Sequence, residues 1–172
     1  MRILAISGSL RAASSNSRAI AALALLAPAG VTVEIWQGLD GLPYFNPDLD
    51  IDPAPPAVAA WRSAVEDCDA LVISSPEYAH GVAGAMKNAL DWLVSHPGLH
   101  ETLVAVINAT PPGEYNQAHM RDNLSVMFTT LVEEAFVTIN LRGRPEAPET
   151  IAADPELAAP LRQLLRVLSA LG

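Results

Sequence analysis

Residues 75–92 read SPEYAHGVAGAMKNALDW and join the apolar run Leu71-Val72-Ile73 to a segment of helical periodicity. The Ser-Pro pair ends the apolar run, because proline cannot donate to a strand ladder. In open α/β folds, the place where a strand ends in a polar turn and passes directly into a helix is where ligands bind. The stretch therefore predicts a sheet covered by helices, with a ligand site at the carboxyl ends of its strands.

The rest of the chain continues this alternation of apolar runs and helical patterns. The expected strands are 2–7, 31–36, 70–75, 102–108 and 136–141, and the expected helices are 15–26, 55–67, 81–95, 115–134 and 154–171. Because crossovers between parallel strands are right-handed, these units predict an α/β fold, a flavodoxin-like three-layer sandwich with a five-stranded parallel sheet in the order 2-1-3-4-5. A chain of 172 residues fits a single domain, 1–172.

Composition excludes several classes of partner. The formal net charge of −9 argues against nucleic acid and anionic membrane surfaces as partners. The single cysteine, Cys68, excludes an intramolecular disulfide and suits a reducing compartment. No signal-peptide pattern precedes the first strand, and no apolar stretch approaches the roughly 18 residues of a membrane span. We therefore expect a cytoplasmic protein without a nucleic-acid or membrane partner.

A second junction comes earlier, where GSLRAASSN (residues 8–16) follows the first expected strand and runs into the first expected helix. Free N–H groups and the helix dipole make a helix N-terminus an anion site. Polar side chains crowd this loop: Ser9, Arg11, Ser14, Ser15 and Asn16. One alternative is that the last three only cap the helix, but capping needs one such residue. The loop therefore predicts a phosphate site.

Other phosphate chemistries lack their motifs. The chain has neither GxxxxGK followed by Ser or Thr, as in P-loop NTPases, nor GxGxxG after its first strand, as in Rossmann dinucleotide folds. Low-molecular-weight phosphatases carry a cysteine in a comparable loop, whereas Cys68 stands before the third strand. We expect Cys68 to be a buried apolar residue and not a nucleophile.

The turn Pro76-Glu77-Tyr78 suits a flat ligand. The N–H groups of Glu77 and Tyr78 point away from the sheet, where they can read the hydrogen-bonding edge of a ring such as isoalloxazine while Tyr78 packs against it. An alternative for Glu77 is a nucleophile at the end of a strand, as in a nucleoside-processing transferase.

The two segments together resemble a known family. GSLRAASSN is similar to the pattern GSxRxxSxN, and SPEYAHGVAGAMKNALDW is similar to PEYxxxxxGxxKNAxDW, both typical of the NADPH-dependent FMN reductases, a flavodoxin-like group that includes quinone, azo-dye and chromate reductases. The resemblance implies a phosphate grip for FMN by Ser9, Arg11, Ser14 and Asn16, with Ser15 beside them. It places Pro76, Glu77, Tyr78 and Ala79 along the flavin ring, with Thr110 as a further donor.

The resemblance also implies an activity. NADPH or NADH would reduce FMN and leave before a small electron acceptor enters, such as a quinone, an azo or nitro compound, or a metal oxyanion. The flavin carries the chemistry, so we expect no catalytic side chain and no metal site. A homodimer or homotetramer is expected, in which Asp91 and Trp92 face a partner, although Trp92 can equally be a packing residue.

Some residues depart from the pattern, and some alternatives stay open. Ala79 replaces an Asn that many members carry, Ala83 replaces a Pro, and NATPPG (residues 108–113) replaces a glycine-rich run. The protein can also be a reductase that uses FMN as a dissociable substrate, or a flavodoxin-type electron carrier. His80 either tunes the flavin site or has no duty there. His96 and His100 do not predict a metal site, because Pro97-Gly98 breaks the helix between them.

Overall fold

The computed structural model describes residues 1–96, 99, 102–127, 130–144 and 146–172. A six-stranded sheet in the order β2-β1-β3-β6-β7 forms its centre, with β8 also paired to β6. Every pairing in it is parallel. The strands are β1 (Arg2–Ser7), β2 (Thr32–Trp36), β3 (Ala70–Ser74), β6 (Leu103–Asn108), β7 (Thr130–Leu131) and β8 (Val137–Thr138). The predicted flavodoxin-like order 2-1-3-4-5 is confirmed, with β7 and β8 sharing the fifth place.

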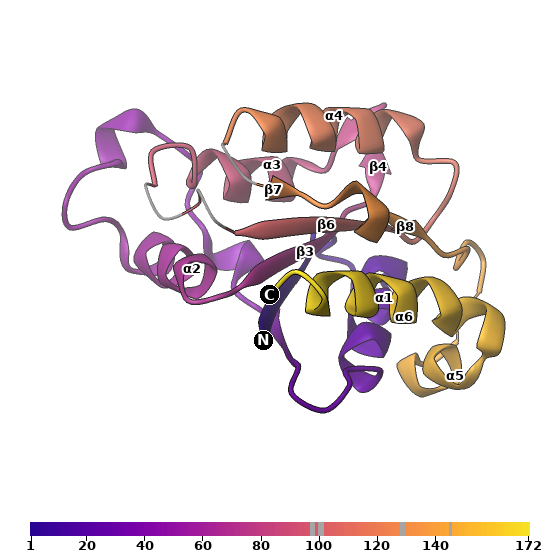
Figure 1. Cartoon of the computed structure of the whole chain (residues 1–172). Helices are drawn as coiled ribbons and strands as arrows, with labels where there is room; N and C mark the ends of the chain where they lie inside the picture. Colours follow the sequence, from indigo (N-terminus) through magenta and orange to yellow (C-terminus); the bar gives the residue numbers. More distant parts are fainter. Residues whose placement is uncertain (97–98, 100–101, 128–129, 145) are drawn as a thin grey trace.

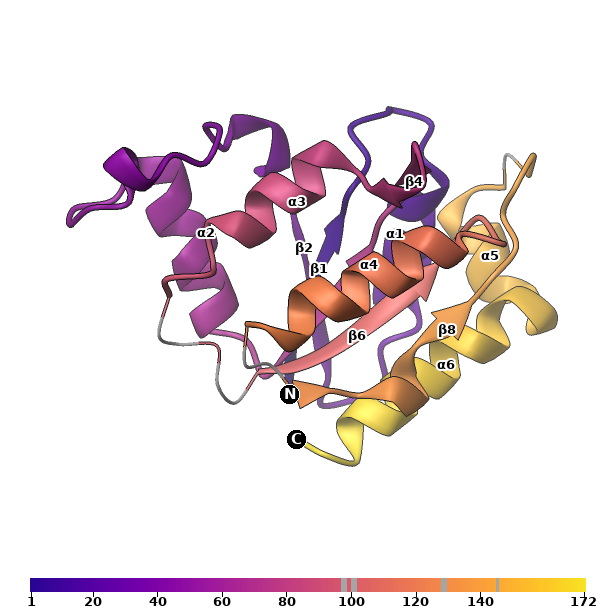
Figure 2. The same ribbon diagram turned by 90° about the horizontal axis from the view of Figure 1, so that it is seen from above.

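Helices cover both faces of the sheet, which gives the three expected layers (Figure 1). One face carries α1 (Ser15–Leu25), α5 (Pro148–Ala153) and α6 (Pro155–Ser169), and the other carries α2 (Pro56–Glu66), α3 (Gly84–Asp91) and α4 (Glu114–Ser125). Figure 2 shows α3 and α4 in front of the sheet and the two chain ends close together. No helix in the described part of the chain is long and apolar enough to cross a membrane.

The last helix forms as its sequence predicts. The Asp154 carboxylate accepts hydrogen bonds from the N–H groups of Glu156 at 2.8 Å and Leu157 at 3.1 Å. Pro155 occupies the first helical position, where its missing N–H costs nothing. The leucines of one face are buried against the sheet: Leu157, Leu161, Leu164, Leu165 and Leu168. An N-cap and an apolar stripe at helical spacing together fix α6.

The predicted strand 136–141 and helix 115–134 are wrong in extent. A one-turn 3-10 helix, Glu133–Ala135, divides the fifth strand position, so that Thr130 pairs with Leu103 and Val137 with Ile107. Helix α4 ends at Ser125, because the chain must turn back to bring β7 beside β6. The part of the predicted helix at 128–129 lies outside the described residues.

The predicted helix 81–95 starts later and ends earlier, at Gly84 and Asp91. The residues before it form an antiparallel hairpin of β4 (Glu77–Tyr78) and β5 (Gly81–Val82). Alternation over so few residues carries no strand signal, which is why the hairpin is absent from the sequence prediction. The short helix α5 was also not predicted, since six residues cannot show helical periodicity.

Candidate functional site

The loops after β1 and β3 touch each other at Gly8. Its N–H donates to the carbonyl of Ser74 at 2.8 Å, which continues the β1–β3 ladder by one bond. A Cβ at Gly8 would lie 2.6 Å from Oγ of Ser75, closer than real Cβ contacts permit. Only glycine therefore lets the two predicted ligand loops come this close.

The start of α1 combines helix capping with free donors. Ser14 is the N-cap, since its Oγ accepts from the N–H of Ser17 at 3.2 Å. The N–H groups of Ser15 and Asn16 in the first turn have no acceptor among the described residues. These two amides and the positive end of the helix dipole face the mouth of the loop and suit an anion.

Two of the predicted polar side chains also have structural contacts. Ser15 Oγ donates to the carbonyl of Leu141 at 3.4 Å, and Asn16 Oδ1 accepts from Ser74 Oγ at 2.9 Å. The capping alternative thus describes part of what this loop does. Arg11 differs from these residues, because its guanidinium is exposed and makes no hydrogen bond or ion pair with the described residues. The backbone N–H of Arg11 lies 3.4 Å from Ser9 Oγ, which holds the loop in a tight turn.

Both predicted loops line one cavity of about 240 Å³. Its walls are Ser9, Arg11, Ser14, Ser15, Asn16, Pro76, Glu77, Tyr78, Thr110, Pro112, Gly113 and Arg142. The structure thus brings together all but one of the residues that the sequence singled out. The exception is Ala79, which lies in the hairpin turn beside the cavity and not in its wall.

The hairpin turn has an unusual backbone. Ala79 and His80 have φ angles of 49° and 59°, in the left-handed region that two-residue hairpin turns require and that non-glycine residues rarely adopt. The His80 ring stacks on Tyr115 with 4.2 Å between centroids and 14° between planes. This stacking fixes His80 against α4, outside the lining of the 240 Å³ cavity. Tyr78 remains 54% exposed at the rim.

Glu77 is tied to the helix opposite. Its Oε2 accepts from the backbone N–H of Asn116 at 3.0 Å, in the first turn of α4. Asn116 Nδ2 in turn donates to the carbonyl of Ser75 at 3.0 Å. The carboxylate thus accepts from one of the free N–H groups at the start of α4, and its negative charge interacts favourably with the positive end of the helix dipole. A nucleophile needs a free carboxylate aimed at the substrate, so this contact favours a structural role for Glu77.

The loop after β6 closes the far wall. Asn108 Oδ1 accepts from the N–H of Thr110 at 3.2 Å, and its Nδ2 donates to the carbonyl of Pro112 at 2.8 Å. Gly113 has a φ of 56°, and a Cβ there would lie 3.0 Å from Asn108 Oδ1. A single asparagine therefore shapes the segment that replaces the glycine-rich run and places Thr110 in the cavity wall.

Arg142 is a wall residue that the sequence prediction missed. Its Nη2 lies 3.5 Å from the carbonyl of Thr110, and the residue lines the cavity. The signal was available, because Arg142 directly follows the predicted strand 136–141 and carboxyl ends of parallel strands share one edge. Arg11 and Arg142 give the cavity two guanidinium groups.

The expectation that Trp92 faces a partner is wrong. Trp92 is fully buried, and its Nε1 donates to the carbonyl of Pro43 at 2.8 Å. Asn88 binds the same segment through Nδ2 to the Pro43 carbonyl at 2.9 Å and through Oδ1, which accepts from Phe45 N at 2.7 Å. The Asn and Trp of the KNALDW motif thus anchor the loop after β2. Asp91 pairs with Lys87 on the same helix.

Cys68 lies at the opposite, amino edge of the sheet, just before β3. Burial raises the pKa of its thiol to about 11, so it is protonated at neutral pH. The side chain is half-buried rather than fully buried as expected, and the raised pKa agrees with the expectation that Cys68 is not a nucleophile. Part of the His96–His100 pair lies outside the described residues, and no three His, Cys, Asp or Glu side chains gather within the described ranges as a metal site would need.

The donors in the cavity fit FMN. Arg11, the Ser9 hydroxyl and the first-turn amides of α1 suit a phosphate dianion, and Glu77 is the one acidic residue among the described residues that line this cavity. The other end offers a proline, a half-exposed tyrosine and the Thr110 segment, which suit the flat ring of a flavin. The close approach at Gly8 brings both ends within one cavity.

Comparisons with known proteins agree with this fit. The model of the NADPH-dependent FMN reductase family matches residues 1–142. Probable NADPH:quinone oxidoreductase 2 of Oryza sativa subsp. japonica is 30% identical over 178 residues, which cover 99% of this chain and 88% of that protein. An NAD(P)H-dependent FMN reductase of Pseudomonas aeruginosa is 39% identical over 97 residues, covering 56% of this chain and 52%, about half, of that protein. The fold of FerB, a flavoenzyme NAD(P)H:(acceptor) oxidoreductase from Paracoccus denitrificans, matches with a TM-score of 0.75 at 22% identity, over 98% of this chain and 97% of that one.

Proposed function

The chain belongs to the NADPH-dependent FMN reductase family, which makes it an NAD(P)H-dependent oxidoreductase with FMN as cofactor, and we propose that its electron acceptor is a quinone. The observation that supports the FMN site is that residues of the loops after β1 and β3 line the same cavity. Relatives named as quinone oxidoreductases support the choice of acceptor.

The phosphate end of the cavity supplies binding energy. Arg11 donates to the FMN phosphate as a fork, and Ser9 and the amides of Ser15 and Asn16 add neutral donors. Arg142 also lines the cavity and adds a second positive charge. Charge-assisted hydrogen bonds of this kind favour FMN as a cofactor that stays bound between turnovers over FMN as a dissociable substrate.

The ring end of the cavity orients the cofactor. FMN held in this cavity would supply the hydride and electron transfer between reduced nicotinamide and the acceptor. The edge of the ring lies against the Glu77–Tyr78 segment of the cavity wall, where the Glu77 carboxylate is held by the N–H of Asn116 in α4. Tyr78 and Thr110 both line this cavity, and Tyr78 is exposed to solvent. An open face favours an enzyme that admits two substrates in turn.

Oligomeric state and location belong to the same proposal. We take residues 1–172 to act as one FMN-binding domain that forms a homodimer or homotetramer in the cytoplasm. Tyr44 supports a subunit contact, because it is 90% exposed while the backbone on both sides of it is clamped by Asn88. A reducing cytoplasm suits both the nicotinamide reductant and the free Cys68 thiol.

The test is a comparison of Arg11→Gln with Arg162→Gln. Arg162 is exposed on α6, away from the cavity, and serves as the matched control. Losing a charge-assisted contact of about 1.5–3 kcal/mol should raise the Kd of FMN roughly 10- to 150-fold in Arg11→Gln. The control should bind FMN and reduce benzoquinone as the wild type does. Equal FMN affinity in both variants would contradict the assignment of the phosphate site.

A further inference from the structure

A second cavity lies on the other side of the loop after β1. It has a volume of about 440 Å³, and Ser9 and Arg11 belong to its walls as well as to those of the FMN cavity. The two cavities are therefore neighbours separated by one stretch of backbone. A ligand in the second cavity would reach the same guanidinium as the FMN phosphate.

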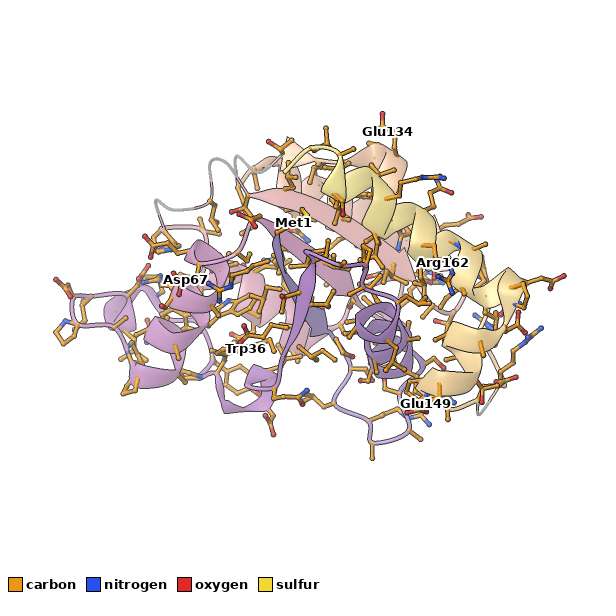
Figure 3. The ribbon with its side chains drawn as sticks, turned by 60° about the horizontal axis from the view of Figure 1, so that its bottom comes forward. Met1, Trp36, Asp67, Glu134, Glu149 and Arg162 are labelled. Atoms are coloured by element: carbon orange, nitrogen blue, oxygen red, sulfur yellow. The ribbon has the colours of Figure 1, made fainter. Side chains whose placement is uncertain are left out.

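One wall of the second cavity is aromatic and rigid. Trp36, which is labelled in Figure 3, ends β2. Its ring packs on that of buried Trp61 with 5.4 Å between ring centroids. A Cβ on Gly38 would lie 2.7 Å from Cζ2 of Trp36, so the backbone rests directly on the indole. Its buried Nε1 has no acceptor among the described residues. Trp36 is only partly buried and belongs to the lining of this cavity, so the exposed part of its indole can contact a flat heterocycle.

The remaining walls are polar in a pattern that suits a sugar. Ser7 and Ser17 form a hydroxyl pair, with 2.9 Å between their Oγ atoms, at the base of the cavity. Asp40 and Gln37 stand exposed at its rim. A carboxylate accepts hydrogen bonds from two adjacent hydroxyls, which is how many dinucleotide folds hold an unmodified ribose after their second strand.

We propose that this second cavity binds the adenosine end of the nicotinamide dinucleotide, and that Asp40 makes the protein select NADH over NADPH. The proposal rests on the proposed function, because it places the reductant of that reaction. The base lies against Trp36, the ribose hydroxyls reach Asp40, and the dinucleotide phosphates pass beside Arg11.

Charge decides the selectivity. A 2′-phosphate carries nearly two negative charges at neutral pH. It would lie beside the Asp40 carboxylate, and the only positive side chain among the described residues lining this cavity, Arg11, already faces the FMN phosphate. Repulsion in a partly exposed site should reduce kcat/KM for NADPH about tenfold relative to NADH.

Steady-state kinetics with saturating FMN and benzoquinone test the selectivity. The wild type should prefer NADH about tenfold, and Asp40→Asn should bring the ratio of the two kcat/KM values to within about threefold of unity. Asp48→Asn is the matched control, since Asp48 is an exposed acid in the same loop but outside both cavities. A wild-type preference for NADPH, or a ratio that Asp40→Asn leaves unchanged, would overturn the proposal.

Calorimetry separates this proposal from the proposed function. ADP-ribose should bind the FMN-saturated protein more tightly than its 2′-phosphate, and Asp40→Asn should remove the difference. If the two ADP-riboses bind in this order but neither NADH nor NADPH reduces the flavin, the assignment of the second cavity stands and the proposed function fails. If reduced nicotinamide reduces the flavin but Asp40→Asn leaves the affinity for ADP-ribose unchanged, the proposal for the second cavity is overturned and the proposed function stands. If FAD binds more tightly than FMN and Asp40→Asn weakens FAD binding, the second cavity holds the adenosine of a flavin. That result would also overturn the proposal.

Discussion

Ala79→Asn should stabilise the protein, because it relieves strain in the turn beside the flavin site. Ala79 has a φ of 49°, and a non-glycine residue in that region loses about 1–2 kcal/mol relative to a right-handed conformation. Asparagine tolerates this region better through local hydrogen bonding, and the exposed position leaves room for its side chain. Recovering half of the strain gives about 0.5–1 kcal/mol, or a rise in Tm of roughly 1–4 °C for a chain of this size.

Urea unfolding of the protein at one fixed, saturating FMN concentration measures the gain, since bound ligand itself adds stability. Ala29→Asn is the control, because Ala29 is exposed in a turn whose φ is not positive. It should change the free energy of unfolding by less than about 0.5 kcal/mol. The strain argument is refuted if Ala79→Asn is no more stable than Ala29→Asn.

Changes at three further residues test other parts of the protein. Glu77→Ala should lower the free energy of unfolding by about 1–2 kcal/mol, because it removes the acceptor at the N-terminus of α4. Glu77→Gln should keep the kcat of quinone reduction within about threefold of the wild type. A severe loss of kcat in Glu77→Gln would instead favour a nucleophilic role for Glu77. Asn88→Ala should cost about 1–3 kcal/mol and expose the loop after β2 to chymotrypsin, which limited proteolysis detects. Cys68, with a thiol pKa raised to about 11, should react with iodoacetamide at pH 8 about two orders of magnitude more slowly than after unfolding in urea; equal rates would contradict its burial.

Periodicity predicted the sheet because every strand that faces the site is covered on both sides. β1 and β3 are apolar almost throughout, so their bounds follow directly from the sequence. The fifth strand position did not follow, since residues 130–138 gain their pairing from β6 and not from a local pattern. Tertiary pairing decided the structure there, against the helical propensity of the residues before it.

The site was predictable to the extent that its residues follow strands. The residues after β1 and β3 were found because polar turns there interrupt apolar runs. The role of Asn88 as an anchor of Pro43 and Phe45 could not be predicted, because it depends on a contact between residues far apart in the chain. The same holds for Glu77, whose carboxylate meets α4 only after folding.

The most direct test of the proposed function is an absorbance spectrum of the protein, loaded with FMN, desalted, and then mixed anaerobically with NADH or NADPH. We expect the flavin band to be retained on the protein, to bleach with reduced nicotinamide, and to return when benzoquinone is added. Retained flavin that neither nucleotide bleaches would contradict an NAD(P)H-dependent reductase and favour an electron carrier. A protein that retains no flavin, and oxidises NADH no faster with free FMN, would contradict the FMN site itself.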